Sequence, residues 1–269
     1  MPFVKVFGES LTMLRKLFQT TDSSSQHFII NGSGTLGWDQ VASNLSEPGD
    51  DVLVLHTGYF ADSFADCFEA YGVKPTQLKA PIGDRPQLDA VEKALKEKKY
   101  KLITVTHVDT STGVLSEIEA LSKLVHKVSP ETLVVVDGVC SVGSEEIQFD
   151  NWGIDCVITA SQKGIGCPAG LSIVMASGRA VQAFKNRKTP PNSYFASWKN
   201  WMPSELRPST LTRQSTNKPQ SCKTTKQRSH PTSLLLLHNW CTPSTRRLHK
   251  SPPYRSPRAL RPTAPPRRK

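Results

Sequence analysis

The sequence lacks the features that mark a metal site, a disulfide framework or a membrane protein. Its six cysteines include no close C-x-x-C pair and stand beside no cluster of histidines, so we expect neither a metal ion nor disulfide bonds. No apolar run approaches the roughly 20 residues that a membrane helix needs, and the N-terminus shows no secretory signal pattern. We therefore expect a protein of an intracellular, reducing compartment with no membrane partner.

Acidic residues are almost absent from the last quarter of the chain. Residues 203–269 contain 15 lysines and arginines, one acid and 11 of the 20 prolines, which leaves 19 basic and 22 acidic residues before them. The net charge of +11 therefore comes from this tail. A mixture of Pro, Ser, Thr and Arg without apolar periodicity predicts a disordered segment. Nucleic acid is an alternative partner for the tail, but no aromatic interleaving or recognition motif supports it.

Residues 1–202 alternate short apolar runs with amphipathic stretches. The apolar runs predict strands at 28–30, 52–55, 102–108, 133–136, 157–159 and 171–175. Apolar spacings of three and four residues predict helices at 1–18, 35–45, 59–71, 88–96 and 116–127. This alternation indicates one large α/β domain, in which helices flank a mostly parallel sheet and ligands bind where the strands end.

A glycine turn at residues 32–35 lies between the first predicted strand and the helix that follows it. Backbone amides at a helix N-terminus attract an anion, so Ser33, Gly34 and Thr35 are candidates for binding a phosphate. The turn matches neither the dinucleotide fingerprint nor the nucleoside-triphosphate loop. The alternative is a tight turn with an N-cap and no ligand.

Two further polar residues follow buried strands. Asp137 ends the run 133–136, where a carboxylate needs a cation such as a protonated pyridine nitrogen; a helix cap or a buried salt bridge would also explain it. Lys163 follows the run 157–159 among small residues, as expected for a buried Schiff-base lysine of lowered pKa; a solvated loop lysine is the alternative. Together with the glycine turn, these residues supply the three anchors that pyridoxal 5'-phosphate (PLP) requires.

Four motifs in order carry a resemblance to a known family. Residues 135–143 (VVDGVCSVG) and 159–164 (TASQKG) resemble the core signature of class V aminotransferases. Residues 107–113 (HVDTSTG) and 32–39 (GSGTLGWD) are similar to the forms found in fungal alanine-glyoxylate aminotransferases. Serine-pyruvate aminotransferases share most of these motifs. The resemblance covers residues 1–202 and implies the large domain of the type I PLP-transferase fold.

The resemblance also implies a role for each residue at the cofactor. Lys163 is the catalytic residue that would bind the PLP aldehyde and then move a proton between substrate and cofactor carbons. Asp137 would keep the ring nitrogen protonated, while Val139 and Phe60 would pack on opposite ring faces; without the family, Phe60 reads as a core aromatic. His107 stays outside the catalytic set. The full set of expected cofactor residues is Ser33, Gly34, Thr35, Phe60, Thr110, Asp137, Val139, Gln162 and Lys163.

The sequence also departs from the family pattern at both ends. Family members begin some tens of residues earlier and continue past 202 with a segment that reaches the partner subunit's phosphate and a small domain that carries an arginine for the substrate carboxylate. Neither feature is expected here, and the abrupt change of composition after residue 202 suggests a shifted reading frame or a retained intron.

Two hypotheses for function follow. The first is a homodimeric aminotransferase that exchanges amino groups between alanine or serine and glyoxylate or pyruvate, giving glycine. The second is a noncatalytic remnant that keeps part of the PLP site but cannot dimerise or bind a substrate carboxylate, so that turnover is strongly reduced or absent. Family members occur in the peroxisome and the cytoplasm, and the chain ends Arg-Arg-Lys rather than in the peroxisomal Ser-Lys-Leu.

Overall fold

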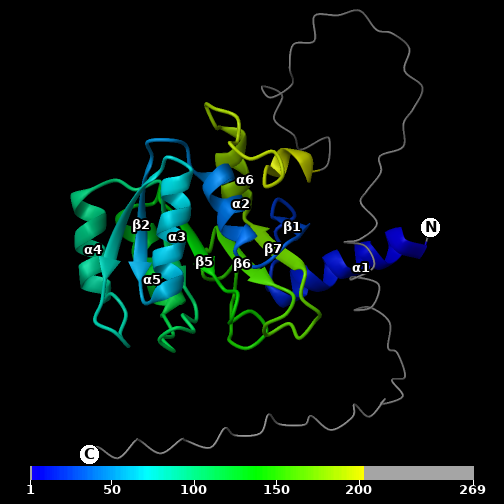
Figure 1. Cartoon of the computed structure of the whole chain (residues 1–269), viewed down its shortest axis with the longest axis horizontal. Coiled ribbons are helices and arrows are strands. Elements are labelled where there is room, and N and C mark those ends of the chain that lie inside the picture. Colours follow the sequence, from blue (N-terminus) through cyan, green and yellow to red (C-terminus); the bar gives the residue numbers. More distant parts are fainter. Residues whose placement is uncertain (1, 203–269) are drawn as a thin grey trace, which may run out of the picture.

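The computed structural model describes residues 2–202, in which a central sheet lies between two layers of helices (Figure 1). This arrangement confirms the predicted α/β class with a mostly parallel sheet. The predicted disordered tail, residues 203–269, lies outside the described residues and stays a prediction. Within residues 2–202, no helix has the length and apolar character needed to cross a membrane.

The sheet of the described part has seven strands: β1 (Gln26–Asn31), β2 (Asp51–His56), β3 (Lys74–Lys79), β4 (Leu102–Thr106), β5 (Leu133–Asp137), β6 (Cys156–Ala160) and β7 (Leu171–Ala176). Their order is β1-β7-β6-β5-β4-β2-β3. Strand β7 is antiparallel to both of its neighbours, β1 and β6, and the other pairs are parallel. All strands except β7 therefore point the same way, so their carboxyl ends meet at one edge of the sheet.

The helices of the described part are α1 (Pro2–Leu17), α2 (Leu36–Leu45), α3 (Tyr59–Ala70), α4 (Leu88–Glu97), α5 (Ile118–Val128), α6 (Gly178–Lys185) and a short 3-10 turn, Trp198–Asn200. One apolar core lies between the sheet and α2, α3 and α6, and a second lies between the opposite face and α1, α4 and α5. Strand β5 serves both cores, because Val135 faces the first while Val134 and Val136 face the second. Burial on both faces explains its unbroken apolar sequence.

Besides the short 3-10 turn, one strand and one helix were not predicted from the sequence. Strand β3 pairs only with β2 at the edge of the sheet, and its polar sequence KPTQLK is at most half-buried, so it has no apolar run to reveal it. Helix α6 is eight residues long, and its N-cap is Ser177, whose Oγ accepts a hydrogen bond from the Ala180 amide over 3.1 Å. That N-cap marks the start of α6 more clearly than its short apolar pattern does.

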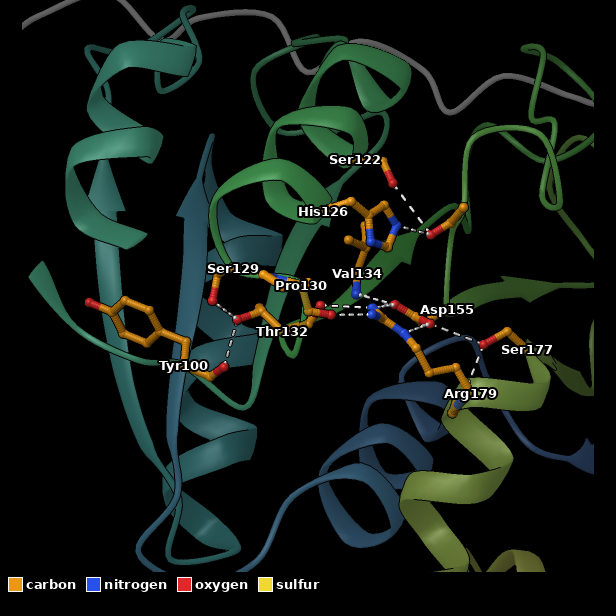
Figure 2. A network of polar contacts seen from close by, with 12 residues as sticks. Tyr100, Ser122, His126, Ser129, Pro130, Thr132, Val134, Asp155, Ser177 and Arg179 are labelled. Atoms are coloured by element: carbon orange, nitrogen blue, oxygen red, sulfur yellow. Dashed lines mark hydrogen bonds and ion pairs between the residues drawn. The ribbon is translucent and has the colours of Figure 1, made fainter. Parts of the chain in front are cut away.

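The amino edge of the sheet is tied together by an ion pair between the half-buried Arg179 and the buried Asp155 (Figure 2). Asp155, next to β6, accepts hydrogen bonds from the Val134 amide over 2.7 Å and from Arg179 Nε over 2.8 Å. Arg179, on α6, also donates to the carbonyl oxygens of Pro130 and Thr132. These contacts fix α6 and the first residues of β5 and β6, at the edge opposite to the carboxyl ends of the same two strands.

Candidate functional site

A pocket of about 160 Å³ lies at the carboxyl ends of the parallel strands. Eight of the nine predicted cofactor residues line it, although they come from four separate segments of the chain. Thr110 is the exception, because it is exposed and is not part of the lining. The residues of the lining are Ser33, Gly34, Thr35, Trp38, Phe60, Thr106, Val108, Asp137, Val139, Cys140, Gln162 and Lys163.

The glycine turn after β1 presents free backbone donors to this pocket. The amides of residues 33–35 form no hydrogen bond with any of the described residues. The Thr35 side chain does not cap α2, which removes the N-cap alternative, and its Oγ1 lies instead 2.5 Å from Ser33 Oγ. A Cβ on Gly34 would come within 2.8 Å of Val139 Cγ2, so glycine allows the turn to approach the segment after β5 this closely. The turn is therefore suited to an anion at the start of α2.

Asp137, the last residue of β5, places a buried carboxylate in the pocket. Trp38 Nε1 donates to its Oδ2 over 2.7 Å, and the Val139 amide donates to its Oδ1 over 3.1 Å. Burial raises the pKa of Asp137 to about 6, although these two hydrogen bonds act in the opposite direction. Among residues 2–202, no lysine, arginine or histidine forms an ion pair with it. The salt-bridge alternative therefore fails, and the carboxylate needs a cation from elsewhere.

Lys163 and Gln162 lie in the turn that follows β6. Both line the pocket, but Lys163 is exposed, whereas the sequence predicted a buried lysine. Lys163 lies in a turn three residues beyond the end of β6 and next to the exposed Gly164, so it is not enclosed as the strand itself is. Gln162 is half-buried, and its Oε1 is shielded from solvent without a hydrogen-bond partner. Both side chains are thus uncommitted and available to a ligand.

Phe60 and Val139 both line this pocket. Phe60 is half-buried at the start of α3 and packs edge-on against Trp38 at 6.5 Å. It therefore also contributes to the core, as the residue pattern alone predicted. The start of α3 is held by the segment after β4, because the Tyr59 amide donates to Ser111 Oγ over 2.9 Å and Ser111 Oγ donates to Asp109. These bonds fix the position of Phe60.

Four lining residues were not assigned from the sequence: Trp38, Thr106, Val108 and Cys140. Each lies inside or beside one of the polar segments at the strand ends, and that position is the signal that would have revealed them. His107 is a different case. It is buried outside the lining, and burial lowers its pKa to about 4, so its ring is neutral at physiological pH.

Comparison with known proteins agrees with this geometry. The model of the family described as Aminotransferase class-V matches residues 5–191. An alanine-glyoxylate aminotransferase of Saccharomyces cerevisiae is 45% identical over 208 residues, covering 75% of this chain and 54% of the relative. An L-aspartate-glyoxylate aminotransferase of Paracoccus denitrificans is 33% identical, covering 70% and 48%. The chain thus spans about half the length of the curated relatives it matches.

A solved structure gives the same result for the fold. The crystal structure of an alanine-glyoxylate aminotransferase from Nostoc sp. superposes with a TM-score of 0.70 at 30% identity, covering 76% of this chain and 54% of that one. The family match over residues 5–191, the yeast relative and the Nostoc structure all indicate the same family. The chain belongs to the class V family of PLP-dependent aminotransferases.

Proposed function

We propose that the chain binds PLP in the pocket at the carboxyl edge of the sheet and transfers amino groups from alanine or serine to glyoxylate or pyruvate. The observation that carries this proposal is a single pocket that contains free backbone amides, an unpaired buried carboxylate and a lysine. With glyoxylate as the acceptor, the product is glycine.

The residues present fit PLP at each of its three polar positions. The free amides of residues 33–35 suit the phosphate, and the Gln162 side chain, which lines the same pocket, can add its Nε2 as a donor. Asp137, which lacks a cation among the described residues, suits a protonated ring nitrogen. Lys163 suits the aldehyde, and its exposure leaves it accessible to that group. Phe60 and Val139 supply apolar surface for the two faces of the ring.

The chemistry follows from these positions. When bound, PLP supplies an electron-withdrawing ring that stabilises negative charge on the Cα of an attached amino acid. The Lys163 amine would hold the aldehyde, and as a free amine it would act as the general base that moves a proton at the substrate carbon. The ionised Asp137 carboxylate holds a proton on the ring nitrogen. Phe60 and Val139 exclude water from the two faces.

The names of the relatives support glyoxylate as the amino acceptor. The yeast and Paracoccus proteins are named as glyoxylate aminotransferases, but their names differ in the amino donor, alanine or aspartate. Alanine is the first donor to test, because the chain shares 45% identity with the yeast protein and 33% with the Paracoccus protein. The yeast relative and the sequences of residues 32–39 and 107–113 also support a fungal source.

Assembly and location form part of the same proposal. We propose a homodimer, because Tyr59 and Ile82 are 66% and 97% exposed in segments that follow the carboxyl ends of β2 and β3, and a second copy would cover them. We propose the cytoplasm or the peroxisome as the compartment. Sedimentation analysis and microscopy of a fluorescent fusion carrying the tag at its N-terminus test these two points.

One observation favours a second candidate, a protein that binds PLP without turnover. Lys163 is the only basic side chain that lines the pocket in the described part of the chain. Once it is engaged at the cofactor, residues 2–202 offer no second cation at the pocket for a substrate carboxylate. This candidate predicts a PLP complex that does not respond to alanine.

Titration with PLP separates these candidates. The parent chain and Lys163→Ala are titrated while the visible absorbance of bound cofactor is followed, and alanine and then glyoxylate are added. A saturable band that requires Lys163, changes with alanine and is restored by glyoxylate with release of glycine supports the aminotransferase. A band that ignores alanine supports the second candidate. The absence of a Lys163-dependent band rejects both.

A further inference from the structure

Trp38 has no assigned role in the sequence, yet it contacts the carboxylate at the centre of the site. Its Nε1 donates a hydrogen bond to Asp137 Oδ2 over 2.7 Å. Trp38 is 7% exposed and Asp137 is 3% exposed, so this bond is shielded from water. The contact joins the first turn of α2 to the end of β5, across 99 positions of the sequence.

The direction of the Trp38 N–H is fixed by the packing of its ring. The indole stacks on Phe64 at 5.4 Å with an interplanar angle of 15°, and meets Phe60 edge-on at 6.5 Å. The backbone of α2 is held equally closely, because a Cβ on Gly37 would lie only 2.1 Å from Ile158 Cγ2. A rigid indole therefore connects the ring-stacking residue Phe60 to the carboxylate of Asp137.

The chemistry of the bond gives it a preferred charge state. An indole N–H can donate but cannot accept, so it stabilises a carboxylate more than a carboxylic acid. A buried hydrogen bond to a charged group is also stronger than one between neutral groups. The bond to Trp38 is the largest effect that opposes burial at Asp137, ahead of the bond from the Val139 amide.

The other titratable groups around Asp137 do not replace this bond. Asp109, from the segment after β4, raises the pKa of Asp137 and thus opposes ionisation. His107 donates to the Asp137 carbonyl oxygen only through its backbone amide, and burial keeps its ring neutral. Lys163 and Cys140 line the same pocket, and neither forms an ion pair or hydrogen bond with the carboxylate.

We propose that Trp38 is a positioning residue, whose indole N–H holds the Asp137 carboxylate ionised and directed into the pocket, and so keeps a proton on the ring nitrogen of bound PLP. The inference rests on the proposed cofactor site and extends it to a residue that acts through Asp137. Trp38 thereby also links the charge at the ring nitrogen to the packing of Phe60 on the ring.

The test compares Trp38→Phe with Trp198→Phe. Both changes remove a buried indole, but Trp198 donates to Gln40 Oε1 over 3.3 Å and does not line the pocket. In Trp38→Phe, PLP should bind about tenfold more weakly or worse, as expected for loss of a bond to a charged group. The 15N chemical shift of the ring nitrogen of 15N-labelled PLP should move toward its unprotonated value. Trp198→Phe should change neither quantity.

A second measurement needs neither PLP nor a destabilised variant. In the unliganded parent, the Trp38 indole 1H–15N resonance should shift with pH with a midpoint near the Asp137 pKa of about 6, and should not do so in Asp137→Asn. If Trp38→Phe does not fold, the resonance is assigned by elimination with variants of the other four of the five tryptophans.

The outcomes separate this inference from the proposed function. A parent that binds PLP, with the same affinity and 15N shift in Trp38→Phe, overturns the role of Trp38 and leaves the proposed function intact. A parent that does not bind PLP rejects the proposed function, and the indole titration then decides about Trp38. An indole resonance that does not move between pH 4 and 8 and that has the same chemical shift in Asp137→Asn overturns the proposal in either case, because the indole N–H then does not sense the carboxylate.

Discussion

Replacing Asp137 by asparagine should change the way in which the stability of the cofactor-free chain depends on pH. Burial raises the pKa of Asp137 from 3.8 to about 6. The folded chain therefore holds a proton between these values that the unfolded chain has released, so folding stability falls as pH rises through this window. A difference of about two pKa units corresponds to about 3 kcal/mol. Above pH 6 both states are ionised, and the loss is complete.

Urea unfolding of both proteins at several pH values between 4 and 7.5 measures this effect. The free energy of unfolding of the parent minus that of Asp137→Asn should decrease by about 2.4 kcal/mol from pH 4 to pH 7, because part of the full window lies below pH 4. Burial lowers the pKa of His27 and His107 to about 4, so these groups stabilise the fold as pH rises. They are present in both proteins and cancel in the difference. If the difference in unfolding free energy stays constant over this range, burial does not raise the pKa of Asp137, and the reasoning is refuted.

Three further predictions concern the scaffold and the phosphate site. Gly37→Ala should destabilise the fold by about 1–3 kcal/mol in urea unfolding, because its Cβ would overlap Ile158 on β6. Arg179→Ala should cost about 3–5 kcal/mol in the same assay, because it leaves the buried Asp155 carboxylate without its cation. Pyridoxal without a phosphate should bind at least about tenfold more weakly than PLP in an absorbance titration, because the free amides of residues 33–35 lose their anion.

Matched controls make the two scaffold predictions specific. Gly8→Ala adds the same methyl group inside α1 where nothing lies within 4 Å, and should not destabilise the chain. Lys123→Ala breaks an exposed ion pair with Glu119, and should cost only about 0.3–0.5 kcal/mol. If Gly37→Ala or Arg179→Ala behaves like its control, the packing of α2 on β6 or the amino-edge ion pair is not important for stability.

The pocket could be predicted because its residues follow apolar strands. Asp137 ends one run that has to be buried on both faces, and Lys163 lies three residues beyond another; parallel strands bring such positions to one edge. The same rule placed the glycine turn after β1 in the pocket. The rule also applies to β1, which pairs only with the antiparallel β7. Because β7 is antiparallel to both β1 and β6, β1 runs in the same direction as β6.

What could not be predicted depends on contacts between distant parts of the chain. The apolar sequence of β7 does not indicate whether the strand runs parallel or antiparallel to its neighbours. Strand β3 is polar because it pairs along one side only. The bond from Trp38 to Asp137 joins α2 to β5, so no local pattern announces it. The exposure of Lys163 and the outward position of Thr110 depend on the path of two turns, which residue type alone does not specify.

The most direct test of the central claim is to locate the lysine that binds PLP. The full chain is incubated with PLP, reduced with sodium borohydride, digested and mapped by mass spectrometry, with Lys163→Arg as the control. The pocket predicts that substoichiometric PLP labels Lys163 ahead of the other lysines, and that the control loses this label. Label spread evenly over the exposed lysines, with Lys163 no more reactive than the rest, would contradict a PLP site at this pocket.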